Sequence, residues 1–249
     1  MKQSQSLIPV LIEHNKNITW LRLNNTSQLN ALNPEMINIL TNGIKEALSR
    51  ETKLIVFSGE GIAFSSGFDL SKLDQESDAD LLYRFVKIEE LLQSIYKLPI
   101  SSVALVHGKC FGAGADIVAS CQHRIASHET TFRMPGLQFG IVLGTRRLSL
   151  LVGKENAINF LETSRIFNAD EALKSGFLTN INSSTEWPKI IEEISEKASN
   201  LSLSSKNKLM NETRNDTELN NDLAALVKSA AEPGLVKRIQ DFVNTQVKK

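Results

Sequence analysis

The chain has 249 residues, of which 41% are hydrophobic and 22% are charged, and its formal net charge is zero. Such a composition is typical of a soluble globular protein and gives no support for binding to nucleic acid or to a membrane surface. Residues 1–7 are too polar for a secretory leader, and no apolar run approaches membrane-spanning length. The two cysteines, Cys110 and Cys121, do not make a disulfide framework and are expected to be small buried residues. These features predict a cytoplasmic protein.

The N-terminal part begins with two expected strands, at residues 10–12 and 18–23, joined by a polar turn at residues 13–17. Asn33 is a favourable N-cap residue, and Pro34 suits the first position of a helix. The apolar spacing after them predicts that helix.

A strongly periodic helix is predicted at residues 81–98, and Pro99 ends it. Its apolar stripe, which includes Phe85, is interpreted mainly as core. Carboxylates favour helix N-termini, so a solvated loop and a helix start are expected at the preceding acidic residues Asp74, Glu76, Asp78 and Asp80.

Two buried strand patterns, at residues 53–58 and 103–106, each run into a turn of small residues. In the first turn, Gly67 precedes Phe68, whose backbone N–H is a candidate hydrogen-bond donor. We expect the two turns to direct two N–H groups at one oxygen, which is the arrangement that stabilises a thioester enolate.

The second turn contains Gly112 and Gly114 and leads into a helix that carries Asp116 near its start. Backbone N–H groups at a helix start lack partners within the helix and, with the helix dipole, stabilise negative charge. A tight turn that only packs against its own sheet remains the alternative. A dinucleotide fingerprint is excluded because its third glycine position falls on Ile117, and no phosphate-binding loop is present.

Five segments, in chain order, together resemble the crotonase superfamily, the enoyl-CoA hydratase/isomerase family. They are NALNPEM at 30–36, FSSGFDL at 64–70, VHGKCFGAGADIVASC at 106–121, FRMPGLQFGIVLGTRRL at 132–148 and SRIFNADEALKSGFL at 164–178. The resemblance implies an α/β crotonase-like (ClpP/crotonase) spiral of ββα units at residues 1–185. It also implies a C-terminal helical portion at 186–249, which covers coenzyme A and builds a homotrimer or a dimer of trimers.

The resemblance further implies an acyl-CoA substrate, with no separate cofactor because coenzyme A is part of the substrate, and no metal. Asp116 falls on the first of the two glutamates that family hydratases use, and Gly136 falls on the second. Two placed carboxylates hold a water and shuttle its proton, whereas one carboxylate must do both jobs or a different job. Hydration, double-bond isomerisation, decarboxylation of a malonyl-type thioester and acyl-CoA binding without catalysis therefore remain open.

By the same resemblance, the N–H groups of Phe68 and Ala113 bind the thioester oxygen, and Asp116 is the acid/base. The alternative for Asp116 is a carboxylate that only stabilises its helix dipole. Further substrate or CoA contacts are expected at Leu29, Ala31, Ser66, Gly67, Asp69, Leu70, Phe111, Gly112, Pro135, Gly136 and Leu143. Other candidates are Arg133, Arg146 and Arg147 for a carboxylated acyl group, and Lys237 and Phe242 for the nucleotide.

After Gly144 the pattern is mainly helical. Short helices are expected at residues 148–152, 157–161 and 170–174, a strand at 177–181, and longer helices at 187–203, 218–230 and 233–247.

Overall fold

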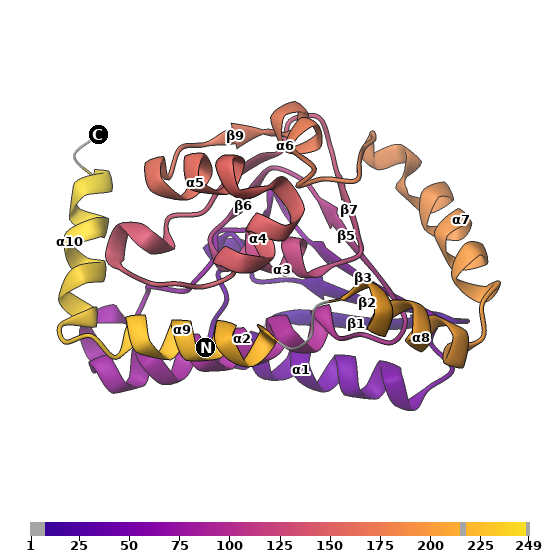
Figure 1. Cartoon of the computed structure of the whole chain (residues 1–249), viewed down its shortest axis with the longest axis horizontal. Helices are drawn as coiled ribbons and strands as arrows, with labels where there is room; N and C mark the ends of the chain where they lie inside the picture. The colour runs from indigo at the N-terminus through magenta and orange to yellow at the C-terminus, as the bar shows by residue number, and fades with distance from the viewer. Residues whose placement is uncertain (1–7, 215–217, 248–249) are drawn as a thin grey trace, which may run out of the picture.

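The computed structural model describes residues 8–214 and 218–247, so the leader prediction for residues 1–7 lies outside it. The chain repeats a unit of one strand in a large sheet, one strand in a small sheet, and a helix (Figure 1). The three units are β3 (Leu54–Gly59), β4 (Ala63–Ser65) and α2 (Asp78–Tyr96); β5 (Ser101–Val106), β6 (Lys109–Phe111) and α3 (Ala113–Ser120); and β7 (His123–Ala126), β8 (Thr131–Arg133) and α4 (Thr145–Val152). This is the ββα spiral that the resemblance implies.

The large sheet has the strand order β1-β2-β3-β5-β7-β10, and the small sheet has the order β4-β6-β8-β9. β1 (Val10–Asn15) pairs antiparallel with β2 (Ile18–Leu23), so the predicted turn at residues 13–17 is too long. The strand extends because His14 pairs with Thr19 in register, and its Nδ1 lies 3.0 Å from the Thr19 hydroxyl. In α1 (Pro34–Ser49) the predicted cap is confirmed, since the Asn33 side chain accepts a hydrogen bond from the Met36 amide.

β3 and β5 lie side by side in parallel and are buried on both faces. Ile55 and Phe57 belong to the main hydrophobic core, which includes side chains from α1, α2 and α3. Leu54 and Val56 face a separate cluster that includes Ile191 of α7 (Trp187–Ser199). Covering both faces of a parallel sheet requires continuous apolar strands, which is the pattern seen in the sequence.

The elements after α4 differ from prediction at two places. The strand expected at residues 177–181 is only β10 (Asn180–Ile181), because Phe177 and Leu178 leave the sheet and enter the core. The helix expected at 187–203 ends at Ser199, and an unpredicted helix, α8 (Leu203–Thr213), follows it. The Ser202 hydroxyl caps α8 by accepting a hydrogen bond from the Ser205 amide. The other elements are α5 (Lys154–Thr163), β9 (Phe167–Asn168), α6 (Ala169–Ser175), α8 (Leu203–Thr213), α9 (Leu219–Ala230), α10 (Leu235–Val247) and the 3-10 helices η1 (Thr26–Gln28), η2 (Leu73–Gln75), η3 (Gly136–Phe139) and η4 (Ser184–Glu186).

The last two helices pack onto the spiral. α9 lies along α2, and α10 stands at one end of the molecule (Figure 1). Leu226, Leu235 and Ile239 of these helices share a hydrophobic cluster with Leu81 and Phe85 of α2. The division expected between residues 185 and 186 stays a prediction.

The predicted loop and helix start are confirmed, since Asp74 is exposed and Asp80 forms a capping box with Ser77 at the start of α2, but two of the acids also have tertiary partners. The Asp78 carboxylate accepts hydrogen bonds from the backbone amides of Gly234 and Val236, each at 2.8 Å, and so holds the start of α10. Glu76 forms an ion pair with Arg84, whose side chain is nearly buried. These partners are distant in sequence, so local pattern did not indicate them.

Within residues 8–214 and 218–247, no helix combines the length and hydropathy needed to cross a membrane. In the same part of the chain, no three histidine, cysteine or acidic side chains converge as a metal site would require. Both cysteines are buried, as expected, and neither forms a disulfide.

The docking of α9 predicts a contrast between two neighbouring side chains. Leu226 is fully buried and Val227 is 37% exposed. Leu226→Ala is expected to lower the free energy of unfolding by about 2–5 kcal/mol, since it leaves a core cavity. Val227→Ala is the matched control, with an expected change within about 0.5 kcal/mol. Urea denaturation measures both, and equally small losses would show that α9 is not packed on α2.

Candidate active site

The two predicted turns meet at one edge of the small sheet. β4 and β6 are parallel neighbours, so the turns that follow them lie together. The contact depends on Gly67, which has φ +94°, and a Cβ at this position would lie 2.7 Å from the Phe111 carbonyl oxygen. Only glycine adopts this backbone and allows the approach at little cost.

Two backbone donors are left unpaired where the turns meet. Among the backbone hydrogen bonds of the described residues, the amides of Phe68 and Ala113 donate none. The flanking groups are paired: Leu32 bonds to the peptide groups on both sides of Phe68, and the Gly112 amide donates to the Arg133 carbonyl at 2.8 Å. Fixed neighbours and free donors are what an oxyanion-binding site requires.

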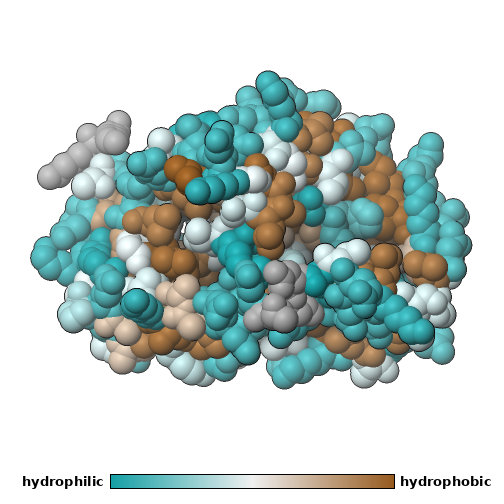
Figure 2. Space-filling view, viewed as in Figure 1, coloured by the Kyte–Doolittle hydropathy of each residue, from teal (hydrophilic) through white to brown (hydrophobic). Residues whose placement is uncertain are grey.

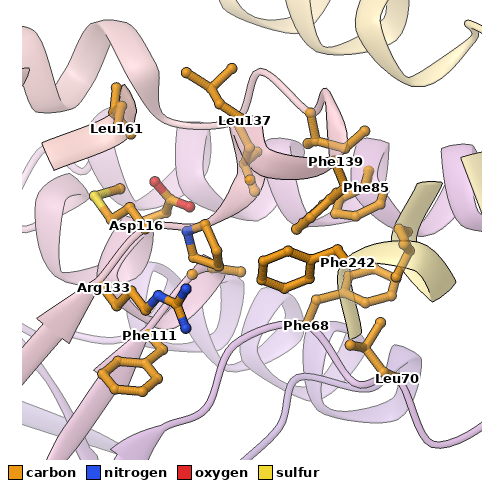
Figure 3. A pocket seen from close by; sticks show the side chains of 18 of the residues that line it. Phe68, Leu70, Phe85, Phe111, Asp116, Arg133, Leu137, Phe139, Leu161 and Phe242 are labelled. Atoms are coloured by element: carbon orange, nitrogen blue, oxygen red, sulfur yellow. The ribbon is translucent and has the colours of Figure 1, made fainter. Parts of the chain in front are cut away.

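These amides border an apolar cavity of about 200 Å³ (Figure 3). In that view the Asp116 carboxyl and Arg133 lie on one side, and the rings of Phe68, Phe85 and Phe242 lie on the other. Figure 2 shows hydrophobic surface gathered in the hollow beside α10. The predicted site residues that line the cavity are Ser66, Phe68, Leu70, Phe111, Gly112, Ala113, Asp116, Pro135, Gly136 and Leu143.

Four of the predicted binding residues do not line this cavity: Leu29, Ala31, Gly67 and Asp69. Leu29 lies behind the first turn, where its carbonyl accepts from the Ser66 amide at 2.8 Å. Gly67 makes the contact between the turns. Roles of these four residues in binding substrate stay predictions.

Asp116 is buried in α3, with only 3% of its surface exposed. Its Oδ1 has no hydrogen-bond partner among the described residues. Burial raises the pKa of this carboxyl to about 8, while the charge of Arg147 lowers it and the charge of Glu89 raises it. The carboxyl is therefore mostly protonated at neutral pH and poised to exchange a proton near pH 8.

Gly144 provides the space for this carboxyl. It has φ +65°, and a Cβ there would lie 1.8 Å from Asp116 Oδ1. The next residue, Thr145, also lines the cavity, and its hydroxyl is buried without a partner in the described structure. The sequence analysis did not select Thr145, because nothing local shows that its side chain is buried in the cavity.

The position of the second family glutamate faces the cavity but holds no acid. Gly136 begins η3, and a Cβ there would lie 3.0 Å from the Ile141 carbonyl oxygen. Asp116 is the one carboxylate among the described residues that line the cavity. A side chain at position 136 would need the Ile141 carbonyl to give by a few tenths of an ångström.

Two of the three arginine candidates are engaged elsewhere. Arg147 is buried and forms a bidentate ion pair with Glu89, and both arginines also pair with Asp222 of α9. The proposal that Arg146 and Arg147 bind a carboxylated acyl group is therefore wrong, since neighbouring carboxylates already hold them.

Arg133 does line the cavity. It donates to the Ser164 carbonyl at 2.8 Å and to the Gln246 amide oxygen at 2.9 Å, and no ion pair forms with it among the described residues. Of the two nucleotide candidates, Phe242 lines the cavity, whereas Lys237 is exposed and pairs with Asp241.

The spiral of ββα units, with two free amides and one buried carboxyl at an apolar cavity, defines a crotonase-type protein. Comparison with known proteins agrees: the family model described as enoyl-CoA hydratase/isomerase matches residues 13–243. The chain belongs to the enoyl-CoA hydratase/isomerase family.

Solved structures support this assignment. A Bordetella parapertussis protein described as an enoyl-CoA hydratase/isomerase is 40% identical, with a TM-score of 0.92, over 94% of this chain and 98% of that one. An enoyl-CoA hydratase from Bacillus halodurans has a TM-score of 0.82 over 94% of this chain and 99% of that one. At 20% identity, the second likeness shows the fold alone.

Among curated relatives, the zebrafish (Danio rerio) mitochondrial enoyl-CoA hydratase domain-containing protein 3 is 34% identical over 175 residues. The match covers 69% of this chain and 61% of that relative. The human protein of the same name is 32% identical over 184 residues, which is 72% of this chain and 61% of that relative. The chain thus spans about three fifths of the length of these relatives.

The buried carboxyl predicts a pH-dependent stability difference between the wild type and Asp116→Asn. In the unfolded chain the carboxyl titrates near 3.8, and in the folded chain it titrates near 8. Between these values the folded state binds the extra proton, so stability from this group is complete below about pH 4 and is lost as pH rises to about 8. The asparagine variant, which resembles the protonated acid, is expected to gain up to about 1.4 kcal/mol per pH unit relative to the wild type.

Urea denaturation at pH 5 and pH 8 checks this difference. Asp170→Asn is the matched control, because Asp170 is exposed on α6 and does not line the cavity. A constant gap between the wild type and Asp116→Asn across this range would contradict the buried, protonated carboxyl.

Proposed function

We propose that this protein is an acyl-CoA-processing enzyme that shifts the double bond of an enoyl-CoA by way of a thioester enolate. The observation that carries the proposal is the single buried carboxyl of Asp116, in the same cavity as the free amides of Phe68 and Ala113. The CoA portion belongs to the substrate, and the reaction needs no other cofactor.

The proposed reaction begins with a β,γ-unsaturated thioester and ionised Asp116. The carboxylate removes a proton from the α-carbon, the C–H electron pair enters the conjugated system, and negative charge reaches the thioester oxygen. The amides of Phe68 and Ala113 stabilise that charge. Asp116 then returns the proton to the γ-carbon, which gives the α,β-unsaturated thioester with all atoms conserved.

Isomerisation suits this site better than hydration does. One carboxyl is sufficient to carry one proton between two carbons, whereas hydration must also hold and activate a water. Gly136 supplies no second acid, and the cavity wall near it is mainly apolar. The raised pKa of Asp116 favours proton transfer with carbon, because its conjugate base is stronger than an ordinary carboxylate.

The test is the conversion of a β,γ-enoyl-CoA, followed by the gain of the conjugated-thioester absorbance. We expect kcat/KM to rise about tenfold per pH unit below about 8 and to level off above it, since ionised Asp116 is the base. Asp116→Asn is expected to lower kcat by about 10²–10⁴-fold while acyl-CoA binding persists. Asp170→Asn serves as the exposed control.

Other outcomes of this experiment identify the alternatives. Loss of conjugated enoyl-CoA that disappears in Asp116→Asn would mean that one acid is enough for hydration. Tight acyl-CoA binding with no turnover across a broad panel would favour a non-catalytic acyl-CoA-binding protein and would reject the isomerase.

Arg133 favours a second candidate, decarboxylation of a malonyl-type thioester. This cation lines the cavity, and its backbone carbonyl binds the Gly112 amide beside the oxyanion site. Arg133 orients the substrate carboxylate, and the bond between the α-carbon and this carboxylate breaks. CO2 leaves, and the electron pair of the broken bond stays with the thioester as the enolate. Protonated Asp116 then supplies the proton to carbon, which its raised pKa allows at neutral pH.

The two candidates have opposite pH profiles. Decarboxylation of malonyl-CoA is expected to fall above pH 8, where Asp116 loses its proton, and isomerisation is expected to rise up to that pH. Arg133→Gln is expected to lower kcat/KM for malonyl-CoA by about 10–100-fold, the value of a charge-assisted hydrogen bond, and to affect neutral enoyl-CoA much less. Equal effects on both substrates would reject carboxylate recognition by Arg133.

The expected homotrimer and the expected cytoplasmic location both stay predictions. The curated relatives described above are named as mitochondrial, and that is a property of those proteins.

A further inference from the structure

The Phe68 ring is held by two consecutive residues of α2. The ring stacks on Phe85, with centroids 4.3 Å apart and planes inclined by 18°. The Arg84 guanidinium carbon lies 4.0 Å from the centroid of the same ring. Both contacts come from one rigid helix, so α2 fixes the side chain of the residue whose amide is the proposed oxyanion donor.

Arg84 also holds the backbone two peptide groups after this donor. Its Nη2 donates to the Asp69 carbonyl oxygen at 2.7 Å, and this carbonyl belongs to the peptide group between Asp69 and Leu70. The same guanidinium therefore contacts the Phe68 ring and the adjoining main chain. Leu32 holds the peptide groups on either side of Phe68 from the neighbouring loop.

The guanidinium is itself fixed and lies outside the site cavity. Its Nη1 donates to Glu76 at 2.5 Å, and only 8% of Arg84 is exposed. Arg84 lines a separate cavity between α1 and α2, bordered also by Asn33 and Lys87. A planar guanidinium suits this position because it stacks on a ring while its N–H groups, fixed in one plane, bind two oxygens; an ammonium has no plane to stack.

We propose that Arg84 is a positioning residue of the oxyanion site, which holds the Phe68 amide in the direction that the thioester oxygen needs. The inference rests on the proposed function. Arg84 reaches the substrate only through Phe68 and Asp69, so its loss affects charge development on the thioester oxygen more than it affects binding of the acyl-CoA. A misplaced donor is costly in the transition state, because the electrostatic gain depends on its preset geometry.

The test reads the donor directly, with butyryl-CoA labelled with ¹³C at the thioester carbonyl. This saturated thioester cannot be isomerised or hydrated, and isotope-edited infrared spectra report how strongly its carbonyl is polarised. Binding to the wild type is expected to shift the stretch to lower frequency, and Ala113→Pro, which removes the other donor at the first position of α3, is expected to reduce that shift.

The variant is the double substitution Arg84→Met with Glu76→Gln, which removes the guanidinium without leaving a half-buried carboxylate unpaired. We expect it to lose at least half of the wild-type frequency shift, to lower kcat by about 10–100-fold, and to leave KM nearly unchanged. Arg84→Lys keeps the charge but not the planar fork, and its frequency shift is expected to lie between that of the wild type and that of the double variant. Ile191→Ala, in the separate cluster under α7, is the control for a general loss of stability.

The outcomes separate this inference from the proposed function. A full frequency shift and full kcat in the double variant would overturn the role of Arg84 and leave the oxyanion site intact. Equal losses of both readouts in Ile191→Ala would also overturn it, by making the effect one of stability. A wild type with no frequency shift would overturn the oxyanion site itself, and the role of Arg84 with it.

Discussion

The close approach of two backbone turns is the constraint on which this site depends. Gly67 touches the Phe111 carbonyl with no room for a Cβ, and this contact brings the Phe68 and Ala113 amides to one cavity. Each turn is anchored by a strand of the small sheet, and the strands are parallel neighbours. The two amides are therefore held in place by the fold, which is the condition for strong electrostatic stabilisation in the proposed role.

The second determinant is the placement of charge around Asp116. Arg147 and Glu89 are both almost fully buried, and they neutralise each other through paired hydrogen bonds. Their effects on Asp116 oppose one another, so loss of hydration dominates and raises its pKa. The buried Arg147–Glu89 pair thus acts on Asp116 with two opposing charges, and Asp222 of α9 also pairs with Arg147.

The sequence predicted the parts of the protein that depend on neighbouring residues. The Asn33 cap, the buried strands β3 and β5, and the turn around Gly67 follow from local composition and from the family resemblance, and the structure has all of them. The experiments described above test whether the predicted site residues act as proposed. Phe242 was predicted only from the resemblance, as a nucleotide contact, and in the structure it lines the cavity.

What the sequence did not predict depends on contacts between distant residues. Asp78 holds the start of α10, and Asp222 pairs with Arg146, although local pattern shows these acids only as polar positions. α8 was not predicted, because its stretch is rich in serine and asparagine and its start depends on the Ser202 cap. Burial of Arg147 is invisible in a sequence, because an arginine is buried only where several partners converge on it.

The contact between Gly144 and Asp116 has an evolutionary consequence. A Cβ at position 144 collides with the Asp116 carboxyl, so the residues allowed at one position depend on the residue at the other. Gly136 is likewise confined by the Ile141 carbonyl, and the two glycines begin neighbouring segments of the same loop region. Acquiring a second acid at position 136 therefore depends on whether the Ile141 carbonyl gives way, while position 144 stays closed to side chains as long as Asp116 is present.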